Sequence, residues 1–200
     1  MKAYYRLKTV LCIAAGLSIG IAGYAAEEGE VKVTIEKLTV EDSVYTPFYE
    51  VETGLDHAPG SAQRWIKLGV YFTTEGGWID EIDIRQMVVF KPEEDSRVYM
   101  SETVKYINLE PGDHYAYVYL HPSYVRRYDI DDHDVDSAAY ISVNGEVAAF
   151  KETSRKTEKN WSADETRSYK NYLLNHAETP FWFINYDYKE IIKRENRPTE

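Results

Sequence analysis

The stretch Leu109-Glu110-Pro111-Gly112-Asp113-His114-Tyr115-Ala116-Tyr117-Val118-Tyr119 (residues 109–119) joins a tight turn to a strand. Proline and glycine in succession favour a turn, because proline fixes φ and glycine adopts backbone angles that other residues avoid. From Tyr115 onward, tyrosines alternate with small or branched apolar residues, which is the two-residue period of a β-strand. Both faces are apolar, as in a central strand that is covered on both sides.

Strand signals continue on both sides of this stretch, from about residue 31 to about residue 150. The alternation begins at Val31 and Val33, and its parity changes between Ile35 and Leu38, which indicates a bulge or a switch between sheets. We expect Gly76-Gly77 and Asn144-Gly145 each to join two strands as a hairpin, and Asn-Gly is the stronger signal because type I′ turns need positive φ at both central residues. The predicted strands cover residues 66–72, 82–90, 98–109, 115–120, 138–143 and 146–151.

The turn and strand of residues 109–119 resemble the corner before the sixth strand of fibronectin-type-III and immunoglobulin-like sandwiches. In that family a Leu-x-Pro-Gly turn leads into a Tyr-x-apolar-x-apolar strand, and the first tyrosine bonds back to upstream backbone. The resemblance implies that Tyr115 is a structural corner tyrosine. We therefore predict a mainly β protein, an immunoglobulin-like antiparallel β-sandwich with a C-terminal helix and an aromatic tail.

The first 26 residues have the pattern of a secretory signal. Lys2, Arg6 and Lys8 precede an apolar run over residues 10–21, and small residues around Gly23-Tyr24-Ala25 provide a cleavage site. The run is shorter than the ~20 residues of a transmembrane helix, so we expect no transmembrane segment in the mature chain. The sequence predicts export to the periplasm, the outer membrane surface or the extracellular space.

The cysteine count and the charge narrow the function. Cys12, the only cysteine, lies in the predicted signal. It follows the bulky Leu11, whereas a small residue precedes a lipidated cysteine, so a lipoprotein is not expected. We expect the mature chain to have no disulfides, thiol catalysis or cysteine-based metal sites. Loss of three basic residues with the signal leaves 20 basic and 34 acidic residues, a net charge of −14. Nucleic acid and anionic lipid are therefore not expected partners. An acidic domain suits cations, basic partner surfaces or neutral glycans, although solubility alone also explains the charge.

The C-terminal part, residues 152–200, differs in composition from the sandwich region, residues 27–151. Ser162-Ala163-Asp164-Glu165 is a capping box, and Thr179-Pro180 is a helix end. We expect this helix and the aromatic tail, residues 181–188, to pack on the sandwich as a lid. The apolar face of the predicted helix carries Tyr169, Tyr172, Leu173 and His176.

The Thr-Pro-Phe, Trp and Tyr-Asp-Tyr pattern of residues 179–188 resembles small secreted immunoglobulin-like proteins of mucus-dwelling gut bacteria, some of them encoded beside type-IV-pilus-like genes. The resemblance implies an accessory or adhesive surface protein. A pilus-shaft subunit is not expected, because a pilin is processed before its apolar run and has a glutamate just inside it. The apolar run of residues 10–21 has no acidic residue.

Five aspartates in residues 129–136 form a candidate for weak calcium binding. Calcium prefers six to eight oxygen ligands, and Asp132-x-Asp134-x-Asp136 begins like an EF-hand loop, but the glycine and glutamate of that motif do not follow. We favour the alternative, a solvated loop between strands. The five candidates are Asp129, Asp131, Asp132, Asp134 and Asp136.

The aromatic residues allow two interpretations. Tyr115, Tyr117 and Tyr119 share one face of their strand, where they either stack on sugars or a partner strand, or, as the corner motif favours, point into the core. Trp78 follows Gly76-Gly77 at a turn, where a large aromatic side chain is hard to bury. Among the other tyrosines, Tyr99, Tyr106, Tyr124 and Tyr128 are less committed to the core. The candidate binding residues are Trp78, Tyr124, Tyr128 and Trp182.

The sequence shows no catalytic motif. It has no Gly-x-Ser-x-Gly elbow, no His-Glu-x-x-His pair and no phosphate-binding glycine loop, so we predict that the protein is not an enzyme and needs no cofactor beyond the possible calcium. We predict a non-catalytic exported protein that contacts other envelope or surface proteins, for example as an accessory of a pilus-like or envelope assembly. The alternative is a carbohydrate-binding module for host glycans. The histidines are scattered without metal-ligand spacing: His57, His114, His121, His133 and His176.

Overall fold

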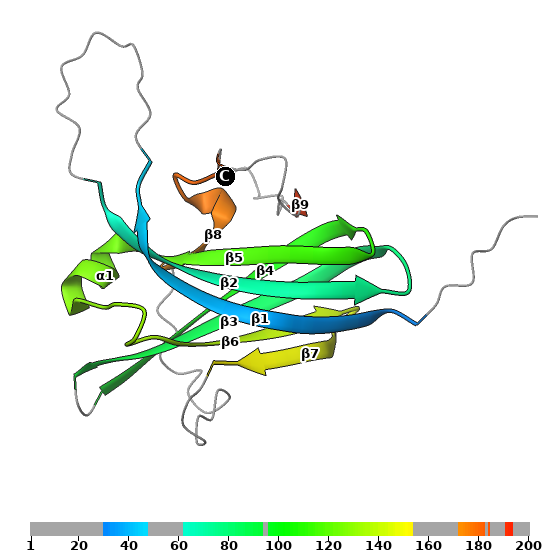
Figure 1. The fold of residues 1–200 in the computed structure, drawn as a ribbon, viewed down its shortest axis with the longest axis horizontal. Helices are drawn as coiled ribbons and strands as arrows, with labels where there is room; N and C mark the ends of the chain where they lie inside the picture. Colours follow the sequence, from blue (N-terminus) through cyan, green and yellow to red (C-terminus); the bar gives the residue numbers. More distant parts are fainter. Residues whose placement is uncertain are drawn as a thin grey trace, which may run out of the picture.

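The computed structural model describes residues 30–47, 62–93, 96–153, 172–182, 184 and 191–193. Within these ranges the chain forms two antiparallel sheets that lie face to face (Figure 1). Sheet A has the order β1 (Lys32–Tyr45), β2 (Arg64–Glu75), β5 (Gly112–Leu120) and β8 (Leu173–Asn175). Sheet B has the order β7 (Glu146–Glu152), β6 (Asp136–Val143), β3 (Ile79–Glu93), β4 (Ser96–Leu109) and β9 (Ile191–Ile192).

This arrangement confirms the predicted antiparallel β-sandwich. The first, second and fifth strands share one sheet and the third, sixth and seventh share the other, as in immunoglobulin-like domains, and β4 pairs with β3. A short helix, α1 (Pro122–Tyr128), connects β5 to β6 across the end of the sandwich, and a 3-10 turn, η2 (His176–Glu178), follows β8.

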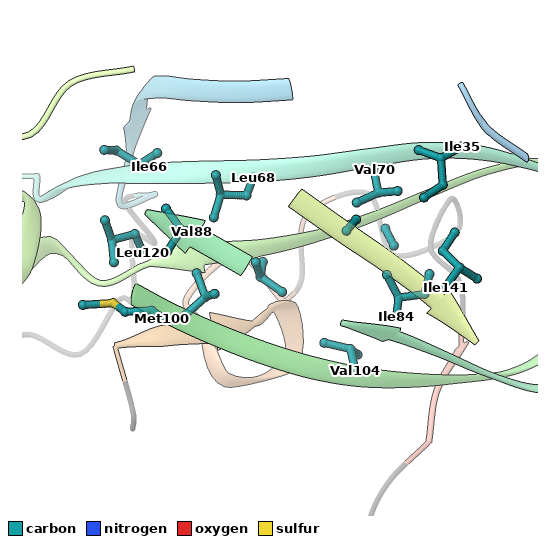
Figure 2. Packing of buried hydrophobic residues seen from close by; sticks show 14 of the residues in the cluster. Ile35, Ile66, Leu68, Val70, Ile84, Val88, Met100, Val104, Leu120 and Ile141 are labelled. Atoms are coloured by element: carbon teal, nitrogen blue, oxygen red, sulfur yellow. The ribbon is translucent and has the colours of Figure 1, made fainter. Parts of the chain in front are cut away.

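The core fills the space between the sheets with alternate residues of facing strands (Figure 2). Ile66, Leu68 and Val70 of β2 face Ile84 and Val88 of β3, and all five are almost completely buried. Since successive strand residues point to opposite faces, this two-residue period is what the alternating sequence predicted.

The structure confirms the Asn-Gly hairpin and the bulge in the first strand. Asn144 and Gly145 have φ of 53° and 81° between β6 and β7, as a type I′ turn requires. The register of β1 against β2 shifts between Ile35 and Lys37, where the apolar parity of the sequence changes.

The predicted hairpin at Gly76-Gly77 is wrong. The strand before it, β2, pairs with β1 and β5, whereas the strand after it, β3, pairs with β4 and β6. Each strand already has two hydrogen-bonded neighbours, so the two cannot pair with each other. Gly76, with φ of 95°, and Gly77, with φ of 152°, instead turn the chain from one sheet to the other.

The predicted place of the corner motif is also wrong. The motif leads from β4 in sheet B to β5 in sheet A, and β5 is the fifth strand, whereas the tyrosine corner of immunoglobulin-like domains precedes the sixth. The connection to the sixth strand here contains α1 instead. Gly112, with φ of 143°, makes the turn into β5.

The predicted C-terminal helix is wrong over residues 173–175, which form β8 and pair with Val118–Leu120 of β5. The capping box in this region is formed by Asn175 and Glu178 around η2. In the described part of the chain, no helix is long and apolar enough to span a membrane. The signal segment, the start of the predicted helix with Tyr169, His57, Trp161 and most of the tail lie outside the described residues.

Candidate interaction surface

The ends of β1 to β7 meet at the right in Figure 1, and we call this region the corner end (residues 30–32, 75–80, 108–113 and 144–147). The strand register brings these segments together, because Lys32 lies opposite Glu75, Ile79 opposite Leu109, and Ile82 opposite Val143. The surface is thus made from turns that are adjacent in space and far apart in the sequence.

A buried pair of polar side chains holds the corner in place. The Thr74 hydroxyl donates to the carbonyl of Glu110 at 3.0 Å and lies 2.9 Å from Nε2 of His114. Because the hydroxyl hydrogen is used by Glu110, Nε2 of His114 must carry the hydrogen that joins it to Thr74. The His114 ring also stacks on Phe72 with ring centroids 4.9 Å apart. Thr74 and His114 therefore perform the bracing that the sequence assigned to the corner tyrosine.

Tyr115 itself lies on the outer face of sheet A, so the prediction that it points into the core is wrong. Its ring stacks on Tyr71, with centroids 4.2 Å apart, and covers Gly69, where an added Cβ would lie 2.7 Å from the ring. Its hydroxyl accepts or donates no hydrogen bond within the described residues. Burial raises the Tyr115 pKa well above its ordinary value. Successive residues of a strand point to opposite faces, and Ala116 and Val118 of β5 pack in the core. Tyr115 therefore points to the outer face.

The other two tyrosines of β5 are buried in a second cluster on this outer face. Phe181 stacks on Tyr119 at 4.6 Å and meets Trp65 edge-on at 5.5 Å, so the C-terminal segment covers this half of the face. Burial raises the pKa of Tyr117 to about 12. Tyr71, which stacks on Tyr115 on the same outer face, is left 40% exposed.

The corner end exposes three large apolar side chains. Trp78 is 61% exposed, Val147 is 62% exposed and Val31 is 36% exposed. The sequence predicts the exposure of Trp78 at a turn, but it does not predict the exposure of Val31 and Val147. Their positions at strand ends, beyond the last residues that face the core, are the signal that could have identified them. Exposed apolar residues that gather in one place mark interaction sites more often than scattered ones.

The same segments of the corner end carry six exposed carboxylates. Lys32 is the only basic residue in the four segments of the corner end, and its Nζ lies 3.5 Å from the Glu75 carboxylate on the open surface. An exposed pair of this kind contributes little to stability. The exposed acidic residues are Glu30, Glu75, Asp80, Glu110, Asp113 and Glu146.

The opposite end of the sandwich, which we call the helix end (residues 62–64 and 121–135), buries one of the two predicted binding tyrosines and half-buries the other. Tyr124 is only 4% exposed and packs against Phe90 and Tyr172, so it is wrong as a surface binding residue. Tyr128 is half-buried, with the Arg127 guanidinium 5.1 Å from its ring. The sequence signal for α1, the helix that buries Tyr124, is Pro122, because proline is favoured at the first position of a helix.

His121 provides the N-cap of α1. Its Nδ1 accepts a hydrogen bond from the Ser123 backbone N–H at 3.2 Å, and burial lowers its pKa. A neutral ring is needed for this bond, because a protonated imidazole has no acceptor.

Two of the aspartates of residues 129–136, Asp131 and Asp134, accept hydrogen bonds from the local backbone. Asp131 Oδ1 accepts from the N–H groups of His133, at 2.8 Å, and Asp134, at 3.2 Å, while Asp129 ends α1 in the left-handed region and lies 3.9 Å from Arg64. In the part of the chain that the structure describes, no group of three or more His, Cys, Asp or Glu side chains is placed to hold a metal ion. Calcium binding by this loop stays a prediction.

The remaining candidate, Trp182, is half-buried and lines a cleft of about 580 Å³ beside the edge of β4. Glu81 pairs with both Lys105 and Lys193 near this cleft, which fixes β9 on the sheet and lowers the Glu81 pKa. Of the less committed tyrosines, Tyr106 is buried and Tyr99 is half-buried.

Comparison with known proteins agrees with this description. A protein-family model matches residues 24–196. The chain belongs to that family. A crystal structure of a protein from Akkermansia muciniphila is similar in fold, with a TM-score of 0.72 and 27% sequence identity, over 84% of this chain and 95% of that chain. No curated protein matches the chain. The family and the structural match support the predicted resemblance to β-sandwich proteins of mucus-dwelling gut bacteria, and the link to pilus-like genes stays a prediction.

Proposed function

We propose that this is a non-catalytic exported protein that acts through protein–protein contacts, and that the corner end is its contact surface. The observation that carries the proposal is the exposure of Trp78, at 61%, in the end of the sandwich whose segments also expose Val31 and Val147. Large aromatic side chains are the commonest anchors of protein interfaces. We place the protein in the periplasm or at the cell surface, as an accessory of a pilus-like or envelope assembly.

The distribution of shifted pKa values supports a role without catalysis. Active sites gather titratable groups with perturbed pKa values in one cleft. In the described part of the chain, the shifted groups are the Glu81–Lys105 ion pair, the three buried tyrosines of β5 and the helix cap His121, and each has a structural cause. The ion pair lies on sheet B, whereas the tyrosines and His121 lie on the side of sheet A, where Tyr119 and His121 both contact Trp65 in a packed aromatic cluster.

Site-specific photocrosslinking in the native cell envelope tests the proposal. A photoreactive phenylalanine analogue would replace Trp78 in one variant and Tyr45, which is 56% exposed at the other end, in the matched control. We expect the variant at position 78 to give a discrete crosslinked band with an envelope protein, and the control at position 45 to lack it. Identical products from both positions, or none from position 78, would contradict the proposal.

Glycan binding is a second candidate, and the outer face of sheet A favours it. The uncovered Tyr71 ring stands beside polar groups that suit sugar hydroxyls: the Thr73 hydroxyl, which donates to Glu36 at 3.3 Å, and Lys67, which pairs with Glu41 at 3.3 Å. Sugars combine apolar ring faces with hydroxyls, and such a surface complements both. A host-glycan array with the wild-type protein, Tyr71→Ala and Trp78→Ala tests this candidate. Loss of glycan signal in either folded variant would support it, and no signal with the wild type would reject it.

A further inference from the structure

We propose that the corner end binds a basic protein surface, one that presents lysine or arginine side chains around an apolar residue. This inference rests on the proposed function and names the chemistry of the partner. It adds a requirement that the proposed function does not contain, because a contact surface centred on Trp78 could equally meet a neutral partner.

The surface contains an exposed aromatic side chain and two exposed aliphatic side chains. Trp78 lies in the connection between β2 and β3, at the point where the chain passes from sheet A to sheet B. Val31 precedes β1 and Val147 follows the hairpin turn into β7, so the three side chains come from three separate segments of the corner end. An aromatic residue within a small apolar group, surrounded by polar residues, is the usual anatomy of an interface centre.

The rim of the surface carries uncompensated negative charge. Of the six carboxylates at the corner end, only Glu75 has a basic neighbour among the described residues, the exposed Lys32. The side chains of Glu30, Asp80, Glu110, Asp113 and Glu146 form neither an ion pair nor a hydrogen bond within the described part of the chain. Like charges that gather without partners repel one another and oppose the compact state.

Charge complementarity indicates which kind of partner the corner end binds. A basic surface would neutralise the rim while its apolar residue covers Trp78, and it would be attracted over distances up to the Debye length, about 10 Å at 0.1 M salt. A second copy of this chain meeting through the same end would bring six further carboxylates against these six, which is unfavourable. Two copies of the corner end are therefore not expected to pair.

Peptide probes test the inference directly. The probes are three labelled ten-residue peptides that alternate lysine with leucine, lysine with serine, and glutamate with leucine. We expect the mature chain to bind only the lysine–leucine peptide at low salt, with an affinity that falls as salt rises. The corner variant combines Glu110→Gln, Asp113→Asn and Glu146→Gln. The matched control removes the same charge at the helix end through Asp129→Asn, Asp132→Asn and Asp134→Asn.

We expect Trp78→Ala and the corner variant each to weaken binding of the lysine–leucine peptide by about tenfold or more, and the control to stay within about twofold. The corner variant should also flatten the salt dependence. Far-ultraviolet circular dichroism and urea unfolding of all variants show whether each is folded. Glu146→Gln alone, on the exposed hairpin, should weaken binding of the lysine–leucine peptide by a smaller factor.

Equal weakening by the control variant, or equal binding of the lysine–serine peptide, would overturn the inference, because the attraction would then depend on overall charge alone. Failure of the peptides together with a specific crosslink from position 78 would overturn the basic partner and leave the proposed function standing. Specific peptide binding without any crosslink in the envelope would support the basic chemistry of the surface and count against the proposed function.

Discussion

At the helix end of the sandwich, Tyr124 and Asp131 are used by the protein itself, whereas at the corner end Trp78 and Glu110 face solvent. Tyr124 packs against the core and Asp131 accepts hydrogen bonds from two backbone N–H groups of its own loop. Trp78 and Glu110, at the other end, have side chains without such contacts in the described residues. The two ends thus contain similar residues in opposite roles.

The difference shows that the local backbone structure determines whether a side chain contacts the protein itself or solvent. The helix end contains a seven-residue helix and a tight turn, whose free N–H groups attract nearby carboxylates and whose apolar face buries tyrosines. The corner end consists of short turns between sheets, and its backbone is satisfied by buried groups such as Thr74. Its exposed side chains therefore remain available for a partner.

The largest effect that separates the ends is expected from truncation of their aromatic residues. Tyr124→Ala should lower the free energy of unfolding by about 3–5 kcal/mol, because it leaves a cavity beside Phe90. Trp78→Ala should change it by no more than about 0.5 kcal/mol, since the side chain is mostly exposed. Urea unfolding followed by circular dichroism measures both. A Trp78→Ala variant as unstable as Tyr124→Ala would show that the corner end is part of the core.

The buried brace of the corner end should give the next largest effect. Thr74→Val keeps the shape of the side chain but removes the buried hydrogen bonds to the Glu110 carbonyl and to Nε2 of His114, which should cost about 1–3 kcal/mol. Thr73→Val, on the half-buried outer face next in sequence, is the control and should cost less than about 0.5 kcal/mol. Equal losses in the two variants, measured by urea unfolding, would show that the Thr74 hydroxyl does not hold the corner.

The strands, the bulge and the Asn-Gly turn could be predicted from the sequence because they depend on local rules. Alternation of apolar residues specifies which face of β2 or β6 is buried, and positive φ at Asn144 and Gly145 requires the residues that are present. The sheet that each strand joins depends on its hydrogen-bonded neighbours, which are distant in the sequence. For this reason the sequence predicts a hairpin at Gly76-Gly77, where the structure has a connection between the two sheets.

The candidate site was predictable only in part. Trp78 could be identified because it follows two glycines at a turn, but Val31 and Val147 look like ordinary strand residues until the strand ends are known. Tyr124 was misjudged because the α1 turn buries it, and Tyr115 because both faces of β5 are apolar and the sequence does not distinguish the core face. Both errors concern tertiary packing, which a single strand pattern does not encode.

The helix end should respond to mildly acidic pH. Burial holds the pKa of His121 below its ordinary value of 6.5, so its contribution to stability is complete above that value and is lost as pH falls through the lower pKa of the folded state. His121→Asn keeps an N-cap acceptor that does not titrate. Between pH 8 and pH 5, the wild type should lose more stability than this variant, because only the wild type loses its cap acceptor on protonation. Parallel unfolding curves for the two proteins across this range would contradict the assignment.

The smallest expected effect compares single carboxylates at the two ends. Asp131→Ala removes the acceptor for the N–H groups of His133 and Asp134 and should cost about 1 kcal/mol, while Asp131→Asn keeps the acceptor and should cost less. Glu110→Ala at the corner end removes a side chain without such contacts and should be neutral, or slightly stabilising because one repelling charge is lost. Urea unfolding at low salt resolves these differences. If Glu110→Ala cost as much as Asp131→Ala, the corner carboxylates would be structural, and their exposure would no longer indicate a surface reserved for a partner.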